Sequence, residues 1–439
     1  MLPTLPTLEG PVVSQFELMR PDKSPITLPT DEILHLGSTV HETTAQASTQ
    51  EHRFQLSETT FADTFLRQAL SSPSPILRYR FGVRAAQSIK WMPWQPYLIR
   101  AHTLSPSGVG SAAGYLLILQ TANEEFALDR QSKTVAHRGK ISAIVRSIAE
   151  RNQIRAVVVE DTSTEGVYYQ TFQGDGEFIR GRLLSRAVNA KGVGGYLFFF
   201  QDGVLHFHTP SYQAGAFSYN YYAKGGASLT AVDQGQNLFP LGVAGVSIVR
   251  YDPYTGDSRR IASNPDLCLK YTKSMYPLAD VPGGALNVAY HTGANGDREA
   301  IAMAQSLYSV ARVNAFHVKI TFRHFTGLRP GHVLELIASP VENSAAPYSG
   351  RYLVTESNTI VDTGAFVVAY TLKRGETERL SGFVDADGAD GEAFVSEFAA
   401  PGQAIGDGET VSSTLARGSG KQTSDRVFTT VSDANSGPA

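Results

Sequence analysis

The sequence predicts a mainly β protein of the α+β class, with two antiparallel β blocks on either side of a small α+β unit. Three observations lead to this prediction. The 40 glycines and 19 tyrosines, with many valines and threonines, favour strands joined by turns. Alternation of apolar and polar residues recurs towards both ends of the chain. Two amphipathic helices fall close together in between, within residues 139–212.

The first β block is assigned to residues 1–138. Its opening 57 residues hold short β-like runs separated by Pro and Gly, and helical spacing of Phe and Leu predicts one helix in 59–70. The run SSPSP ends that helix. Strands are then expected at 76–82 and 114–122, so the block is interpreted as an antiparallel barrel or sandwich carrying one helix.

Residues 139–212 are assigned to the α+β unit. KISAIVRSIAERN places its apolar residues at helical spacing, and RAVVVED follows as a strand. A second helix is expected over 174–188, with Asp175 as its N-cap. Residues 195–210 predict a hairpin that turns at Asp202-Gly203 through a type I′ turn. The inner stripe of the second helix is expected to be Ile179, Leu183 and Ala187.

The second β block is assigned to residues 213–375. It contains a strand within 243–257, a helix that Asp297 can cap and that runs to about Val313, and a closing hairpin within 350–375. The run 316–324 alternates, which predicts a half-buried strand. Its apolar face is Phe316, Val318, Ile320 and Phe322, and its polar face is His317, Lys319, Thr321 and Arg323.

Residues 376–439 form an acidic, Gly-rich C-terminal extension without the periodic apolar pattern of a core. One short apolar patch, formed by Phe394, Val395 and Phe398, is expected to dock on a partner or on the body. This patch and the polar face of 317–323 are the assembly surfaces that we predict, together with Trp91 and Trp94.

Composition excludes several classes of protein. The net charge of −3 gives no electrostatic reason to hold nucleic acid tightly. The single cysteine, Cys268, excludes an intrachain disulfide and is expected to be a buried thiol. We expect no secretion signal in MLPTLPTLEGPVV and no membrane-spanning segment, because no apolar run approaches about 20 residues.

A search for chemistry predicts no catalytic residue, no metal site and no cofactor. GVGSAAG (108–114) misses the dinucleotide spacing and precedes a strand. His206 and His208 share a strand face, but no third ligand is evident. DADGADGEAF (385–394) lacks two ligands of a calcium loop. Trp91 and Trp94 are placed in an interface or a core more readily than on a sugar or a base.

Three segments, taken in order, resemble the hub proteins of phage-tail baseplates, the family of late control protein D and the hub part of VgrG. The first is the pair of helices with the Asp-Gly hairpin, within 140–207. The second is GVSIVRYDPYTGD (245–257). The third is an Ala-rich helix, a strand, a Pro-Gly turn and the terminal hairpin, over 299–337 and 350–374. The likeness covers about residues 135 to 375, and the N-terminal block fits by position and β character alone.

The resemblance implies a structural protein and not an enzyme. Such hubs form homotrimers in which two tube-like β-barrel domains per chain make a pseudo-sixfold ring. The ring joins a sixfold tail tube to a threefold central spike, and DNA passes through it without specific binding. The expected partners are the tail tube protein, the spike protein and the tape measure protein. The expected location is the baseplate of the virion, assembled in the host cytoplasm. Because no β-helical spike follows in this sequence, a separate spike subunit is expected.

Two alternatives stay open from the sequence. One is a tail-associated cell-wall hydrolase or carbohydrate-binding protein that uses Trp91, Trp94 or a carboxylate pair which the sequence does not single out. The other is a monomeric β-rich binding protein. A solution mass of three chains would favour the hub, and a deep cleft with paired carboxylates would favour the hydrolase.

Overall fold

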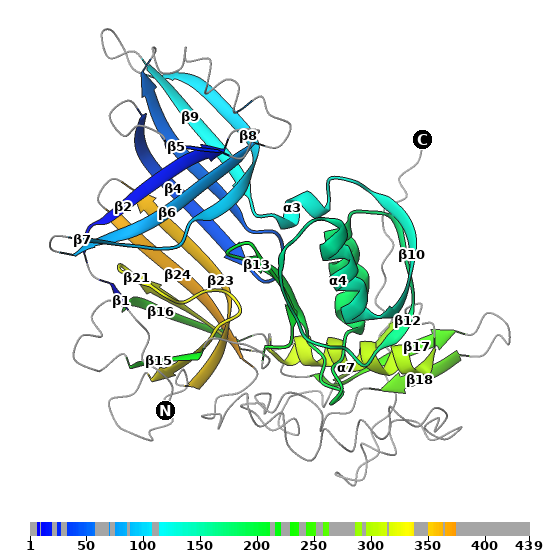
Figure 1. Cartoon of the computed structure of the whole chain (residues 1–439). Helices are drawn as coiled ribbons and strands as arrows, with labels where there is room; N and C mark the ends of the chain where they lie inside the picture. Colours follow the sequence, from blue (N-terminus) through cyan, green and yellow to red (C-terminus); the bar gives the residue numbers. More distant parts are fainter. Residues whose placement is uncertain are drawn as a thin grey trace, which may run out of the picture. The chain divides into compact units, whose positions relative to one another are not determined.

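The computed structural model describes residues 7–8, 10–19, 24–27, 33–57, 70, 75–85, 88–107, 114–210, 216–220, 229–236, 243–251, 258–262, 286–291, 296–313, 316–337, 350–362 and 365–374. Within these residues strands predominate, as expected (Figure 1). The expected helix over 59–70 lies outside the described residues except for its last position. No helix of the described part is long and apolar enough to cross a membrane.

One 14-stranded sheet contains strands from both predicted β blocks. Its main path runs β16-β20-β24-β23-β4-β5-β9-β8-β6-β2-β3, and β7, β15 and β22 pair beside it. The strands of the first block are β2 (Val12–Met19), β3 (Pro25–Thr27), β4 (Ile33–Thr43), β5 (Thr49–Ser57), β6 (Ile76–Ala85), β7 (Ser88–Trp91), β8 (Gln95–Ser107) and β9 (Gly114–Ala122). Those of the second are β15 (Ala216–Asn220), β16 (Leu229–Gln236), β20 (Phe316–Phe322), β22 (Val333–Ile337), β23 (Gly350–Asp362) and β24 (Ala365–Arg374).

The two β blocks are joined by strand pairing, which local sequence patterns did not indicate. β4 and β23 are antiparallel neighbours, in a register that runs from Thr43 opposite Glu356 to Gly37 opposite Asp362. The short strands β1 (Thr7–Leu8) and β21 (Phe325–Thr326) form a second link between the blocks. The sheet therefore passes from one block into the other without a break (Figure 1). The domain boundaries at 138/139, 212/213 and 375/376 stay predictions.

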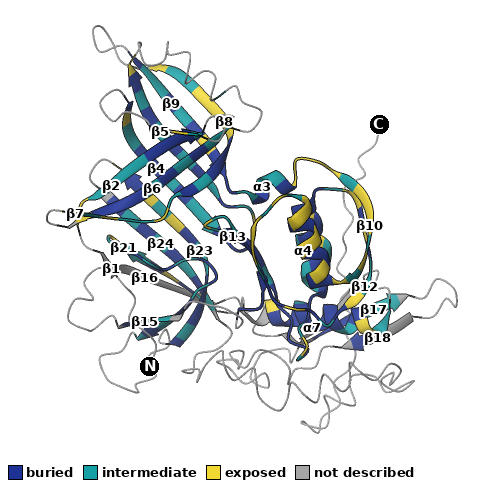
Figure 2. Cartoon of the chain, viewed as in Figure 1, coloured by how far each residue is buried: buried dark blue, intermediate teal, exposed yellow. Residues whose placement is uncertain are grey.

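Both blocks bury one face of the sheet in a shared apolar core. Phe54, Leu77 and Leu119 of the first block and Phe322 and Tyr352 of the second are among its fully buried members. In Figure 2 dark blue residues recur along the strands of both blocks, between teal and yellow ones. Alternation along each strand places the opposite face in solvent.

A chain of polar side chains runs through the core of the first block. Ser14 contacts His35 at 3.0 Å, and Ser38 contacts His35 at 2.7 Å and His52 at 2.6 Å. His52 then contacts Gln50, whose amide donates to the Tyr79 hydroxyl at 2.8 Å. Burial lowers the pKa of His35 to about 4 and that of His52 to about 3, so both rings are neutral at pH 7.

The α+β unit packs helix α4 (Ile141–Arg151) between two small sheets. One is the ribbon of β10 (Lys133–Lys140) and β12 (Glu165–Gln173), and the other contains β11 (Ala156–Val159), β13 (Leu197–Gln201) and β14 (Val204–His208). The apolar face of α4 is buried, as its spacing predicted, and its polar face is exposed (Figure 2). A short helix α3 (Glu125–Leu128) precedes this unit.

The hairpin of the α+β unit turns where the sequence predicted. Strands β13 and β14 are antiparallel, with Gln201 opposite Val204. Asp202 and Gly203 both have positive φ, at 51° and 76°. This is the requirement of a type I′ turn, so that prediction is confirmed.

The expected helix over 174–188 is only partly right. An α-helical turn, α5 (Asp175–Phe178), continues as a π turn at Ile179–Leu183 and a 3-10 turn at Leu184–Arg186. The predicted inner stripe of Ile179, Leu183 and Ala187 is fully buried.

Asp175 is not the N-cap, and that prediction is wrong. Gly174 precedes the helix, and the fully buried Asp175 carboxylate accepts hydrogen bonds from Lys133, Arg151, Asn152 and Gln170. Burial alone would raise the pKa of Asp175, but these donors hold it below its usual value. The same residue type suits either role, and the donors come from segments far from it in the sequence.

Helix α7 (Asp297–Val313) ends where the sequence predicted, but Asp297 is its first residue and not its cap, and the helix packs on a small three-stranded sheet. That sheet contains β17 (Val243–Tyr251), β18 (Ser258–Ala262) and β19 (Leu286–His291). Ile248 and Met303 share a buried cluster, and a buried ion pair joins Glu299 of the helix to Arg186 of the α+β unit. The helix of the second block thus contacts the α+β unit.

The buried histidines predict that acid destabilises the fold. Between pH 6.5 and about 4 the unfolded chain binds protons at His35 and His52 that the folded chain does not bind. Stability is therefore complete above pH 6.5 and falls, by about 1.4 kcal/mol per pH unit for each group, as the pH drops through this window. The midpoint of thermal unfolding, measured from pH 7.5 to 4.5, should fall accordingly.

The His52→Gln variant separates this effect from general acid lability. Its melting midpoint should depend less steeply on pH than that of the parent chain, because one neutral buried imidazole is gone. His102→Gln, at an exposed position of β8, is the matched control and should keep the parent's slope. Equal slopes for all three chains would contradict the assignment.

Candidate assembly surfaces

The polar face predicted for 317–323 lies on the solvent side of the large sheet. Val318, Ile320 and Phe322 are fully buried. Lys319 and Arg323 are exposed, and His317 and Thr321 are half-buried. The alternation expected for this strand is therefore present, while its role as an interface stays a prediction.

This polar face continues across both β blocks, because cross-strand partners share a face of the sheet. Thr321 lies opposite Ala369 of β24, which lies opposite Asn358 of β23. Asn358 in turn lies opposite His41 of β4. We call the solvent side of β20, β24, β23, β4, β5, β9 and β8 the outer face. Its members include Lys319, Thr371, Lys373, Glu356, Asn358, Ile360, Thr39, His41, Glu51, Arg53, Gln120 and Thr103.

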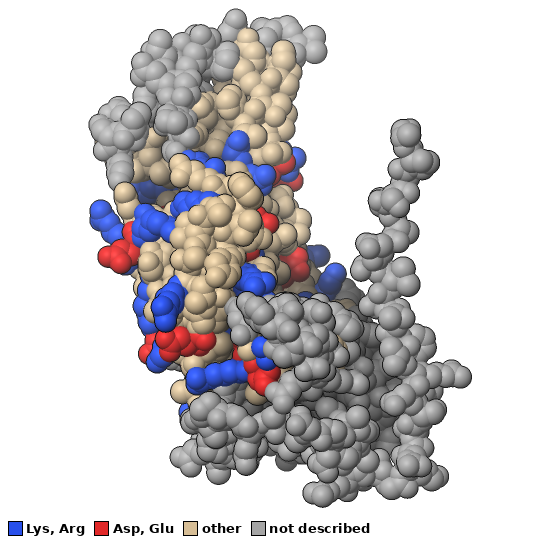
Figure 3. Space-filling view, turned by 90° about the vertical axis from the view of Figure 1, so that its right-hand side faces the viewer, with Lys and Arg blue, Asp and Glu red and all other residues tan. Residues whose placement is uncertain are grey.

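Charges of both signs occupy the outer face. Lys319, Lys373 and Arg53 lie on it with Glu51 and Glu356, and Oε1 of Glu356 lies 2.6 Å from Nε2 of His41. In the view of Figure 3, Lys and Arg side chains are likewise interspersed with smaller groups of Asp and Glu. A surface of mixed sign holds phosphates less strongly than a basic stripe would.

Arg329 joins the three structural parts on the buried side of the sheet. Its Nη1 lies 2.6 Å from Oε1 of Glu42 on β4, and its Nη2 lies 3.5 Å from Oδ1 of Asp202 in the β13–β14 turn. Glu42 also accepts a hydrogen bond of 3.1 Å from Ser357 of β23. Both members of the Arg329–Glu42 pair are almost buried, with 12% and 13% of their side chains exposed. Burial alone would lower the pKa of Arg329, but Glu42 and Asp202 raise it above its usual value.

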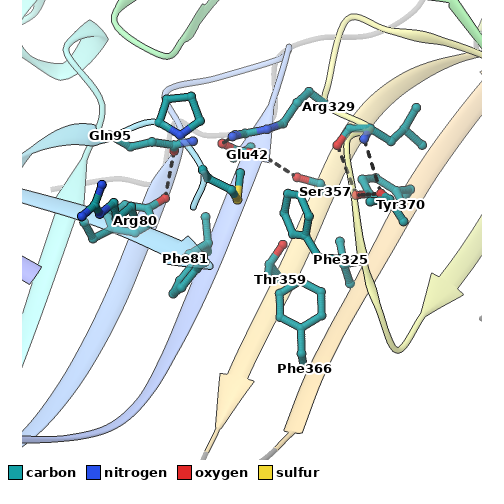
Figure 4. A pocket seen from close by; sticks show the side chains of 17 residues that line it. Glu42, Arg80, Phe81, Gln95, Phe325, Arg329, Ser357, Thr359, Phe366 and Tyr370 are labelled. Atoms are coloured by element: carbon teal, nitrogen blue, oxygen red, sulfur yellow. Dashed lines mark hydrogen bonds and ion pairs between the residues drawn. The ribbon is translucent and has the colours of Figure 1, made fainter. Parts of the chain in front are cut away.

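A small cavity of about 30 Å³ lies beside this ion pair, enough for one or two water molecules. Figure 4 shows its polar end, with Glu42, Arg329, Ser357 and Tyr370, and the phenylalanines that line the rest. Among the described residues that line it, Glu42 is the one carboxylate, and Arg329 neutralises it. The cavity therefore lacks the second carboxylate that a retaining or inverting glycosidase requires.

Trp91 and Trp94 are half-buried beside arginines of β6. The Arg80 guanidinium lies 4.5 Å from the ring centroid of Trp91 and 4.4 Å from that of Trp94. The two tryptophans are therefore brought together, as a cation–π stack on one side of the first block.

His206 and His208 lie on one strand, as predicted, with Nδ1 of the first 3.3 Å from Nε2 of the second. No group of three potential metal ligands is found among the described residues. Burial lowers the pKa of His206 to about 4, and Phe199 stacks on its ring. Several positions singled out in the sequence lie outside the described residues: Cys268, Phe394, Phe398, 385–394 and all of 108–114 except its last residue.

Sequence reasoning missed Arg329 and Glu42. The sequence did predict a turn at Pro330-Gly331, and Gly331 has φ of +89°. Nothing local marks the preceding arginine as buried, because its partner is 287 residues away.

The Arg329–Glu42 pair gives a direct test. Glu42→Gln or Arg329→Met alone should destabilise the chain by about 3–5 kcal/mol, because each leaves a buried charge without its partner. The double variant should recover part of that loss, which denaturant unfolding of all four chains measures as a coupling energy.

The exposed pair of Arg146 and Asp161 supplies the control. Its side chains are 44% and 79% exposed, so Asp161→Asn should change stability by less than about 1 kcal/mol. Additive losses in the Glu42 and Arg329 double variant would show that the two groups do not act together.

Comparison with known proteins identifies solved structures with a similar fold. No family model and no curated protein sequence matches the chain. A tail protein from Neisseria meningitidis MC58 superposes with a TM-score of 0.52 at 11% identity, over 83% of this chain and 97% of the other. The 43 kDa tail protein of prophage MuSo2 from Shewanella oneidensis gives 0.54 at 9% identity, over 83% and 99%.

A chain of the Francisella PdpA–VgrG complex, in its half-lidded state, gives a TM-score of 0.51 at 8% identity, over 87% of this chain and 60% of the other. The structural neighbours are thus phage-tail and VgrG-complex proteins, and the resemblance drawn from the ordered motifs is confirmed at the level of the fold. The chain has the fold of these phage-tail proteins.

Proposed function

We propose that this chain is a structural hub of a phage-tail baseplate, assembled as a homotrimer that joins a sixfold tail tube to a threefold spike. The observation that carries the proposal is the β4–β23 pairing, which makes one sheet from two β blocks. A threefold assembly meets a sixfold ring only if each chain offers two similar docking surfaces. Two β blocks joined side by side supply such a pair.

The outer face supports a channel role. From β16 to β8 the path holds eight neighbouring antiparallel strands, and the strands from β20 to β8 have one buried and one solvent face. Within the described residues, β16 ends this path, and β8 pairs with β6 through Gln95–Leu98. The N–H of Ile99 donates to the Pro75 carbonyl, and the residues of β8 after Ile99 pair with β9 alone. Open edges are templates for pairing with another chain. Three such stretches, placed edge to edge, would enclose a channel lined by the outer face.

The mixed charge of the outer face suits passage of DNA. Favourable DNA binding needs an excess of Lys and Arg that releases counterions from the phosphates. Glu51 and Glu356 lie on this face together with Lys319, Lys373 and Arg53. DNA would then move through the channel without a specific binding site.

The expected partners of the chain follow from the proposed place of its ring between tube and spike. The tail tube and the tape measure protein would meet one end of the ring and a separate spike protein the other, in a particle assembled in the host cytoplasm. The α+β unit contacts the sheet near the end of β4, where Arg180 donates to the Thr44 carbonyl at 3.2 Å. Thr44 follows the last residue of β4, so this contact lies beyond the strands of the outer face.

The proposed homotrimer predicts the mass of the assembly. Native mass spectrometry or light scattering of the purified chain should give three times the 47.4 kDa of one chain. A monomer over the whole concentration range would contradict the homotrimer. Clearing of a peptidoglycan gel by that monomer would favour the hydrolase.

The proposed channel predicts which side chains become shielded in the assembly. Asn358 lies at the centre of the outer face and is exposed, so an Asn358→Cys side chain should react with a small maleimide both in the trimer and in unassembled chains. A maleimide on a long polyethylene glycol should react in unassembled chains and be slowed in the ring, since the channel would exclude it. The parent chain gives the background from Cys268.

Ser147→Cys, at an exposed position of helix α4 and away from the outer face, is the matched control. It should react with both reagents in the assembled protein. Equal protection of the two cysteines would contradict the channel assignment.

A further inference from the structure

A basic and aromatic surface lies on the solvent side of β6 and β7. We call it the Arg–Trp patch and define it as Arg78, Arg80, Arg84, Lys90, Trp91 and Trp94. Leu77, Tyr79, Phe81 and Val83 of β6 are buried, so the arginines between them project to the other side of the strand. The patch belongs to β6, β7 and the turn after β7, and lies outside the strands that form the outer face.

The patch is held in a fixed arrangement before any partner binds. Oε1 of Gln15 accepts two hydrogen bonds from Arg80, at 2.9 and 2.6 Å, which sets the guanidinium between the two indole rings. Trp91 lies over Gly82, where an added Cβ would come within 2.7 Å of the indole. Only glycine lets the ring lie that close to the strand.

The positive charge of the patch is mostly uncompensated. Glu17 lies 3.5 Å from Arg78. Arg80, Arg84 and Lys90 form no ion pair with a carboxylate among the described residues. Arginines in a fixed arrangement beside aromatic rings suit a ligand that carries carboxylates and apolar side chains.

A protein ligand fits this geometry better than a nucleic acid. Stacking of bases requires open aromatic faces. Here the Arg80 guanidinium lies against both indole rings. The Arg78 guanidinium also lies against Trp94, 4.9 Å from its ring centroid. Arg84 and Lys90 are exposed and can meet carboxylates, and both tryptophans are half-buried, so part of each ring is left for apolar contact.

The chain itself contains a segment of the complementary chemistry. Residues 376–399 hold seven Asp or Glu against one Arg, together with Phe383, Phe394 and Phe398. This segment starts two residues after β24 ends at Arg374. About 20 extended residues span up to roughly 70 Å, and a body of this size has a radius of gyration of about 21 Å. The segment is therefore long enough to reach the patch.

We propose that the acidic segment 376–399 docks on the Arg–Trp patch, with its carboxylates on the free arginines and Lys90 and with Phe394 and Phe398 against the indole rings. The docked segment neutralises the patch and covers its aromatic surface. It thereby withholds this side of the first β block from other acidic partners.

Tryptophan fluorescence tests this proposal in the full chain, because Trp91 and Trp94 are the only two tryptophans in the sequence. In the Phe394→Ala/Phe398→Ala variant, the acrylamide quenching constant should rise about twofold as the indoles lose their cover. About 0.5 M NaCl should produce a similar rise in the parent chain by screening the ion pairs. Arg84→Glu, which changes the patch and not the segment, should also raise it.

Phe428→Ala, outside the segment, is the matched control and should quench as the parent does. Circular dichroism and the melting midpoint confirm that each variant is folded. Quenching constants that stay at the parent value in both the double Phe variant and Arg84→Glu overturn the proposal. A second result also overturns it: a short DNA duplex protects the tryptophans from acrylamide quenching while the Phe substitutions have no effect. In that case the patch binds nucleic acid. Neither outcome depends on whether the chain is a trimer.

Discussion

The register of β4 against β23 is the constraint on which the rest of the structure depends. In this register Glu42 lies opposite Ser357, which donates to it, and both point to the buried side where Arg329 lies. A slip of one residue would turn Glu42 to the solvent side and leave Arg329 buried without its carboxylate. The ion pair is satisfied in one register only, and that register also makes the outer face continuous from one β block to the other.

Buried polar groups in this chain sit where separate segments meet. Arg329 connects both β blocks with the α+β unit, Asp175 gathers donors from β10, α4 and β12, and Arg186 pairs with Glu299 of α7. Each of these charges would be costly to bury alone, so each requires its partners to be in place. The apolar core fixes which face is buried, and the charged contacts fix how the parts align.

The parts of the fold that follow from local pattern were predictable. Alternation gave the buried and exposed sides of 316–322, helical spacing gave α4 and α7, and the Asp202-Gly203 pair gave its turn. Pairing of β4 with β23 was not predictable, because nothing within either strand names its neighbour. The role of Asp175 was missed for the same reason: a helix-start aspartate looks alike whether it caps the helix or is buried among distant donors.

The position of the α+β unit completes the case for an assembly surface. A sheet face left open is normally covered by a helix or by another sheet, because layered packing removes apolar surface from water. Here the unit and α7 bury their apolar faces against their own small sheets and contact the large sheet near the end of β4 and through the Asp202 turn. The outer face is polar enough to remain in solvent, yet Ile360 is 44% exposed at its centre. Within the part of the chain that the structure describes, no element covers this broad, polar sheet face, which suits a protein whose remaining contacts come from other chains.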